Sequence, residues 1–268
     1  MEHQKLRTED GALNFQLLWK YLDDFRGALF RSAAGIFVCM IVVFVNPHIV
    51  FDIIIFGPTS SDFGLYRWMC KLGELLSMPS LCIEPFSLRF QNITVSGQFF
   101  SHISTSFWFG LALAFPWIVY QFWRCIKPLL PETGRSAAGK AISFSFLLLV
   151  AGMLTGYFFV LPLAARFLGL YQVADAVQNI TSLTSYVDTF VMLVIGMGLA
   201  FQMPIIILIL SRIGILHRSF LTKYRRHAIV IIVTIMAIIT PTPDPMTMTI
   251  ASIPLLILYE FSIFICRK

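Results

Sequence analysis

The chain has 268 residues, of which 57% are apolar and only 13% are charged, and its mean hydropathy is +0.80. Soluble domains carry about 25% charged residues, so this composition excludes an ordinary water-soluble protein. Lys and Arg exceed Asp and Glu by 20 to 14, and basic cytoplasmic loops explain the net charge of +6 without a nucleic-acid partner. The sequence predicts an all-α, polytopic membrane protein.

Four charge-free stretches predict the first four membrane spans, because each reaches the roughly 20 residues that a helix needs to cross the hydrocarbon core. They are residues 32–51, 90–123, 141–165 and 189–211. A further apolar region, 228–264, is interrupted at 241–245 by three prolines, which a helix does not tolerate in its interior. We therefore expect six transmembrane helices in one domain, 1–268, the last two short, with roughly 13–17 apolar residues each.

The distribution of Lys and Arg predicts the orientation, because cytoplasmic connections carry an excess of them. They concentrate in residues 1–26, 124–140 and 212–227 and at the C-terminal end. The other connections hold only Arg67, Lys71, Arg89 and Arg166. Both termini are therefore expected in the cytoplasm. Residues 1–26 are expected to hold an amphipathic cytoplasmic helix, and 47–100 to form a large extracytoplasmic loop.

The cysteines and histidines agree with this topology. Cys70 and Cys82 fall in the same predicted outer loop, where a disulfide can persist, so we predict a Cys70–Cys82 bridge. The five histidines are scattered over different segments, so the sequence predicts no metal site and no cofactor. In the third span, Gly152 and Gly156 form a pair with the spacing that lets a neighbouring helix approach closely; a chance pair is the alternative.

Carboxylates are the candidate functional groups, since no catalytic motif is found and we predict that the chain is not an enzyme. Glu260 is the acidic residue inside a predicted span, and Asp244 lies at the predicted hairpin tip. At the cytoplasmic face, Asp23, Asp24 and Glu132 stand among basic residues and are suited to bind a guanidinium ligand.

Structural roles are the alternatives for these carboxylates. Glu260 is then a hydrogen-bonded residue between spans, and Asp24 pairs locally with Arg26 or Lys20.

Five short motifs, in this order and spacing, resemble those of a known family. Residues 21–26 read YLDDFR, similar to H-L-x-E-L-R, and residues 115–128 read FPWIVYQFWRCIKP. Residues 157–163 read YFFVLPL and residues 201–204 read FQMP. Residues 240–260 hold TPTPD, then IP and YE. The series resembles TatC, the multispan subunit of the twin-arginine protein translocase.

The resemblance implies a role at the cytoplasmic face of the bacterial inner membrane. The family binds the arginine pair of signal peptides on folded export cargo and assembles with single-span Tat subunits of the TatA and TatB type. It forms homo-oligomers within a receptor complex. By position, Asp24 and Arg26 match the acidic residue and the arginine of the first motif, and Asp23 adds a charge. Gln202 matches a polar position of the fourth span that contacts partner helices.

Two positions depart from the family pattern. The second acidic residue of the family aligns with Gly134, and Glu132, two residues earlier, is the candidate substitute. An aromatic position of the family is here Cys125. Two other functions stay open on the residues alone: a solute or ion transporter that uses Glu260 and Gln202 in a central path, and an intramembrane enzyme.

Overall fold

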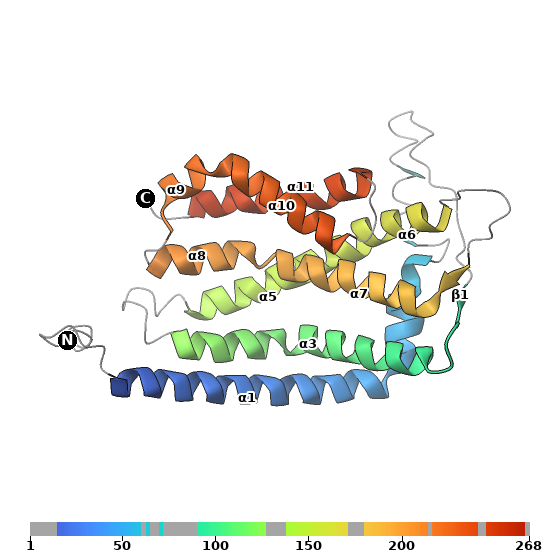
Figure 1. The fold of residues 1–268 in the computed structure, drawn as a ribbon, viewed down its shortest axis with the longest axis horizontal. Helices are drawn as coiled ribbons and strands as arrows, with labels where there is room; N and C mark the ends of the chain where they lie inside the picture. The colour runs from blue at the N-terminus through green and yellow to red at the C-terminus, as the bar shows by residue number, and fades with distance from the viewer. Residues whose placement is uncertain are drawn as a thin grey trace, which may run out of the picture.

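The computed structural model of this chain describes residues 15–59, 63–64, 70–71, 90–126, 138–170, 180–213, 216–240 and 245–265. The elements are α1 (Phe15–Val45), η2 (Ile49–Ile55), η3 (Gly57–Thr59), β1 (Phe90–Gln91), α3 (Gly97–Ile126), α5 (Ala138–Thr155), η6 (Gly156–Val160), α6 (Leu161–Leu170), β2 (Thr181–Ser182), α7 (Leu183–Ala200), α8 (Met203–Ile213), α9 (Arg218–Lys223), α10 (Arg225–Ile239) and α11 (Pro245–Ile265). Most of them lie side by side along the length of a helical bundle (Figure 1).

Five segments are long and apolar enough to cross a membrane. They are Asp23–Val45, Gly97–Cys125, Ile142–Gly169, Leu183–Ser211 and Thr247–Phe264. They match the four charge-free stretches of the sequence and the second half of its fifth apolar region. The chain is therefore a multi-pass membrane protein, as predicted.

The first two spans form an antiparallel hairpin. Gly110 of α3 makes the close approach possible, since a Cβ there would lie 2.7 Å from the backbone nitrogen of Met40 in α1. Trp117 Nε1 donates a hydrogen bond of 3.2 Å to the backbone oxygen of Arg31. Helix α1 is unbroken from Phe15, so the described part of the predicted N-terminal helix is continuous with the first span.

At the end of the bundle where α3 and α7 begin, β1 and β2 form a short parallel pair, which joins the segments that precede these two helices. The hydroxyl of Tyr186 in α7 donates to the backbone oxygen of Ile55 at 2.8 Å, which ties η2 to the fourth span. The rest of the predicted outer loop, including Cys82, lies outside the described residues.

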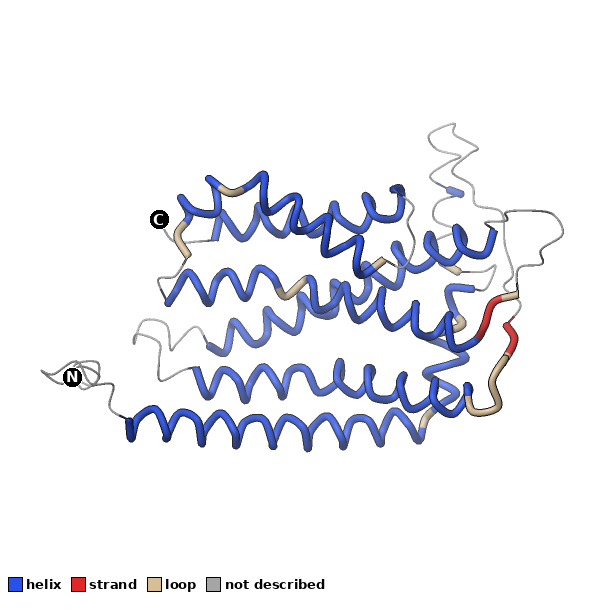
Figure 2. The backbone as a smooth tube through the Cα atoms, in the orientation of Figure 1, coloured by secondary structure: helices blue, strands red, loops and turns tan. Residues whose placement is uncertain are grey.

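Prolines set the irregularities of the third and fourth spans. Pro162 has no N–H to donate to the preceding turn, and the π-helical turn η6 comes directly before it between α5 and α6. Pro204 stands at the start of α8, and the helix breaks at Phe201 and Gln202, the loop between α7 and α8 in Figure 2. The fourth span is consequently two helices.

The glycine pair of the third span does bring two helices together. A Cβ added to Gly152 would lie 2.7 Å from the backbone oxygen of Met197, and one added to Gly156 would lie 2.9 Å from that of Leu193. Both contacts are with the backbone of α7. Of the two alternatives that the sequence leaves open, the structure therefore supports close helix packing over a chance pair.

The last two helices differ in length. Helix α10 has 15 residues and a length of about 22 Å, which is short of a hydrocarbon core of about 30 Å. Helix α11 has 21 residues, so it is longer than the sequence predicted. It begins at Pro245, where proline is tolerated in the first turn, and runs through Pro254 and Glu260. Of these two described helices, α10 is the short one.

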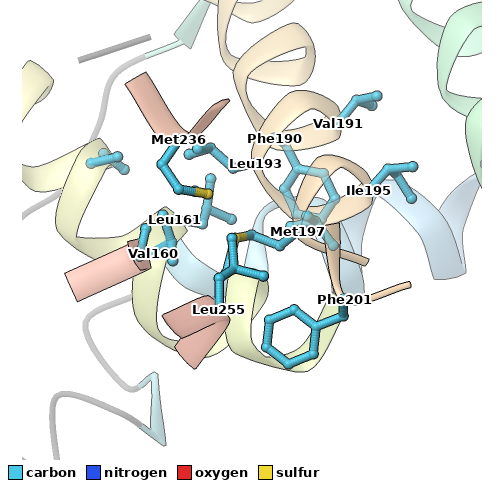
Figure 3. Close-up of a cluster of buried hydrophobic side chains, with 14 of the residues drawn as sticks. Val160, Leu161, Phe190, Val191, Leu193, Ile195, Met197, Phe201, Met236 and Leu255 are labelled. Carbon is cyan, nitrogen blue, oxygen red and sulfur yellow. The ribbon is translucent and has the colours of Figure 1, made fainter. Parts of the chain in front are cut away.

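The core lies where η6, α7, α10 and α11 meet. Figure 3 shows Leu193 and Met197 of α7 beside Leu161, Met236 and Leu255, with Phe190 on the same helix. Five of these six side chains have 0% exposure and Leu255 has 3%. Phe190 and Met197 repeat on one face of α7 at helical spacing, as the packing of a membrane bundle requires.

Candidate functional site

A small hollow lies between α1 and α3. Its lining residues are near the start of α1 and the end of α3, which lie at the same end of the bundle (Figure 1). Its volume is about 200 Å³, enough for a side-chain head group and far too small for a helix. It is lined by Asp24, Ala28, Arg31, Gln121, Arg124 and Cys125. Two of the sequence motifs therefore meet at one place.

Helical spacing brings these residues to a common wall. Asp24, Ala28 and Arg31 stand at positions i, i+4 and i+7 of α1, and Gln121, Arg124 and Cys125 stand at i, i+3 and i+4 of α3. Beside the hollow, the rings of Phe25 and Phe122 meet edge to face with centroids 6.0 Å apart. Small Ala28, which is 2% exposed, leaves the space open.

Asp24 is exposed and lines the hollow. The ion pairs among the described side chains are His48–Asp52 and Arg225–Glu260, so Asp24 is not paired with Arg26 there. The Lys20 side chain lies outside the described part, so that local alternative stays untested. Asp23 and Arg26 are also exposed on α1, but neither lines the hollow. Of the three residues predicted on this helix, only Asp24 lines the hollow.

Gln121 is the unexpected member of the site. Its side chain is only 2% exposed, and its Oε1 atom accepts no hydrogen bond from any described residue. The sequence motif YQFW contains it, but the sequence analysis assigned it no role. A buried polar atom without a partner calls for an explanation. Six such side-chain atoms occur among the described residues, and Gln121 Oε1 is the one of them that lines the hollow.

Gln202 lies at the break between α7 and α8 and is 8% exposed. Its amide makes two hydrogen bonds with Ser145 of α5: Ser145 Oγ donates to Gln202 Oε1 at 2.6 Å, and Gln202 Nε2 donates to the Ser145 backbone oxygen at 3.1 Å. The contact that the structure shows for this predicted partner-binding residue is therefore internal.

Glu260 pairs with Arg225 across α10 and α11, with the Arg225 Nη2 atom 2.9 Å from Glu260 Oε2. About half of each side chain is exposed. The neighbouring Tyr259 donates its hydroxyl to the backbone oxygen of Leu221 at 2.9 Å. Glu260 thus joins the start of α10 to the last part of α11. Among the described contacts it does not meet Gln202, as a central transport path would need.

The remaining predicted residues have mixed outcomes. Glu132, Gly134 and Asp244 lie outside the described residues, so their roles stay predictions. Cys70 is disulfide-bonded, and Cys39 and Cys125 are free. Because Cys82 lies outside the described part, its pairing with Cys70 also stays a prediction. No group of three metal-ligating side chains occurs among the residues that the structure describes.

Comparison with known proteins decides the family. Residues 20–254 match the family described as Sec-independent protein translocase protein (TatC). This chain belongs to the TatC family. The TatC of Blattabacterium sp. subsp. Periplaneta americana is 34% identical over 262 residues, which cover 97% of each chain. The TatC of Aquifex aeolicus is 37% identical over 193 residues, or 72% of this chain and 79% of that one.

The fold agrees with that assignment. A crystal structure described as the twin-arginine translocase receptor TatC superimposes with a TM-score of 0.73 at 30% identity, covering 92% of this chain and all of that one. The TatC relatives are named as translocase components, so membership gives this chain a transport role in a Tat translocase of the bacterial inner membrane. The motif series had identified the family correctly.

Proposed function

We propose that this TatC-family chain is the receptor core of a twin-arginine translocase. It binds the arginine pair of the signal peptide on folded cargo at the cytoplasmic face, and it nucleates assembly with single-span partners and further copies of itself. The observation that carries the proposal is Asp24, an exposed carboxylate that lines a polar hollow. Carboxylates bind guanidinium groups through charge-assisted, bidentate hydrogen bonds.

The orientation that this function needs has support in the bundle. Helix α1 begins and α11 ends at the same end (Figure 1). Arg124, Lys223, Arg225 and Arg226 are exposed in the segments that meet there. With α10 counted as a short sixth crossing, both termini lie on the basic, cytoplasmic side. The short α10 is accommodated by local thinning of the bilayer or by packing in the bundle.

The single-span partners follow from the size of the chain. Its described helices pack on one core, and the hollow described above holds a side-chain head group only. A folded cargo therefore needs a larger assembly to cross the membrane. We place Asp23, Arg26 and Glu132 around the peptide site, and Gln202, Asp244 and Glu260 among the residues that support partner assembly.

The first test is peptide binding to the purified protein in nanodiscs. A signal peptide with Arg-Arg is compared with its Lys-Lys form, on wild type and on Asp24→Ala. We expect the wild type to prefer Arg-Arg and Asp24→Ala to lose about tenfold or more in affinity, the worth of a hydrogen bond to a charged group. Asp52→Ala, which removes an exposed carboxylate at the other end, is the matched control.

Glu132→Ala extends the experiment to the second predicted carboxylate and is expected to weaken Arg-Arg binding in the same direction. Equal affinities for the two peptides, with no effect of Asp24→Ala, would contradict the receptor function.

A further inference from the structure

We infer that Gln121 is the residue of this site that distinguishes arginine from lysine, through a hydrogen bond that its side-chain oxygen accepts from the guanidinium of the ligand. The inference rests on the proposed receptor function, because it assigns the group that gives that receptor its selectivity. The inference starts from the Gln121 side chain, which lines the hollow and is almost fully buried. Its oxygen accepts no hydrogen bond from any described residue.

The first step concerns why Gln121 is present at all. A buried amide oxygen that accepts no hydrogen bond lowers the free energy of unfolding by about 1–3 kcal/mol. An apolar side chain of similar shape carries no such penalty. Gln202 in the same bundle shows the structural solution, with both amide groups bonded to Ser145. Gln121 lacks that solution among the described residues, so its polarity is better explained by a ligand.

The second step concerns the position of the amide. Gln121 precedes Arg124 and Cys125 by about one helical turn, so it lies about 5 Å further into the bundle than these two residues at the end of α3. Asp24 lines the same hollow from α1. Rotation of the terminal amide by 180° exchanges its oxygen and nitrogen at little cost, so either atom can be turned toward the hollow. A head group that enters past Asp24 reaches Gln121 next.

The third step concerns charge. The wall of the hollow carries one carboxylate, Asp24, and two guanidinium groups, Arg31 and Arg124. A ligand held by simple charge attraction therefore gains little here, because the two arginines offset the aspartate. Directional hydrogen bonds must supply the binding. Asp24 and Gln121 Oε1 are the acceptors available in the side chains of the wall.

The fourth step concerns the ligand. A guanidinium group is planar, carries five N–H donors in a fixed arrangement and is weakly hydrated, so it can donate to a carboxylate and to a neighbouring amide oxygen at once. An ammonium group is a compact and more strongly hydrated charge, so burying it costs more than burying a guanidinium, although both meet the same two arginines. The arrangement therefore favours arginine over lysine by geometry. Asp24 accepts hydrogen bonds from one edge of the guanidinium, and Gln121 Oε1 accepts one from another edge.

The experiment measures the affinities of the Arg-Arg and Lys-Lys peptides for the full-length protein in nanodiscs. In Gln121→Leu we expect the affinity for Arg-Arg to fall about tenfold and that for Lys-Lys to change less than about twofold, so the preference is largely lost. Gln121→Glu keeps an acceptor and should retain the preference. Gln98→Leu removes an exposed glutamine at the far end of the same helix and should change neither affinity.

The outcomes separate this inference from the proposed function. If wild type prefers Arg-Arg and Asp24→Ala abolishes binding, but Gln121→Leu keeps the full preference, the role of Gln121 is overturned and the receptor function stands. If wild type shows no preference, both fall. Gln121→Asn, which withdraws the acceptor by one methylene, is measured in parallel in case the leucine variant does not fold, and the same loss of preference is expected.

Discussion

Two buried glutamines, Gln121 and Gln202, lie in different parts of this bundle, and they have opposite surroundings. Gln202 sits at the seam of α5 with α7 and α8, where Ser145 satisfies its side-chain amide. Gln121 sits beside a hollow between α1 and α3, and its oxygen has no partner among the described residues. The first arrangement fastens helices together, and the second leaves hydrogen-bonding capacity for a ligand. Burial of a polar group alone does not tell these two uses apart.

The helix packing around Gln202 is also tighter than the packing around Gln121. The α5–α7 seam is closed by glycines in contact with backbone atoms, and the core residues beside it have almost no exposure. The hairpin of α1 and α3 is close at Gly110 but opens toward its end, where Ala28 and Cys125 are small. A tightly packed seam and an open end on one scaffold fit the proposed receptor, which must hold its shape while a side-chain head group of the peptide enters the hollow.

The largest expected effect on the free energy of unfolding comes from a substitution in the contact between α5 and α7. Gly152→Ala should lower the free energy of unfolding by about 3 kcal/mol, because the added Cβ would lie 2.7 Å from the backbone oxygen of Met197 and the helices must separate. Unfolding in mixed detergent micelles measures it. Gly64→Ala, where no atom lies within 4 Å of the added Cβ, is the control and should be close to neutral. A neutral Gly152→Ala would show that the seam is not rigid.

Ser145→Ala should have the next largest effect, a loss of about 1–2 kcal/mol, because it leaves the oxygen of Gln202 buried without its donor. Ser143→Ala, exposed on the same helix, is the matched control. Adding Gln202→Leu to Ser145→Ala should recover part of the loss, as a double-mutant cycle would report. If Ser145→Ala is as stable as wild type, Gln202 is not a structural residue.

The smallest effect is expected at the other glutamine. Gln121→Leu should leave the free energy of unfolding within about 0.5 kcal/mol of wild type or raise it, since it removes an acceptor that has no hydrogen bond in the described structure. The same unfolding assay checks this, alongside the loss of peptide selectivity expected above. A large destabilisation would mean that Gln121 holds the hairpin together and would remove the contrast with Gln202.

Much of the fold was predictable from local patterns. Runs without charge marked the spans, and the order of five motifs identified the family. The spacing of Gly152 and Gly156 left a chance pair open, and the structure decided for a close helix contact. The length of α11 was not predicted, because the prolines at 241–245 were interpreted as ending helices on both sides. Pro245 instead begins α11, where a missing N–H costs nothing.

The candidate site was predicted in part. Asp24 was expected at a binding site and lines the hollow, whereas Asp23 and Arg26 on the same helix do not. Helical periodicity alone separates them, once it is known which face of α1 meets α3. Gln121 was missed because nothing in a sequence says whether a glutamine in a membrane helix has found a partner.

The sequence by itself determined the membrane class, the helices and the family, since hydropathy and helical spacing are properties of neighbouring residues. Only the tertiary structure decided which polar groups meet. Ser145 and Gln202 are 57 residues apart in the chain, and Arg225 and Glu260 are 35 apart. Such pairs form when helices cross at a fixed height and rotation, which the packing of the whole bundle sets. The same packing leaves the Gln121 side-chain oxygen without a partner among the described residues, in the hollow that Asp24 also lines.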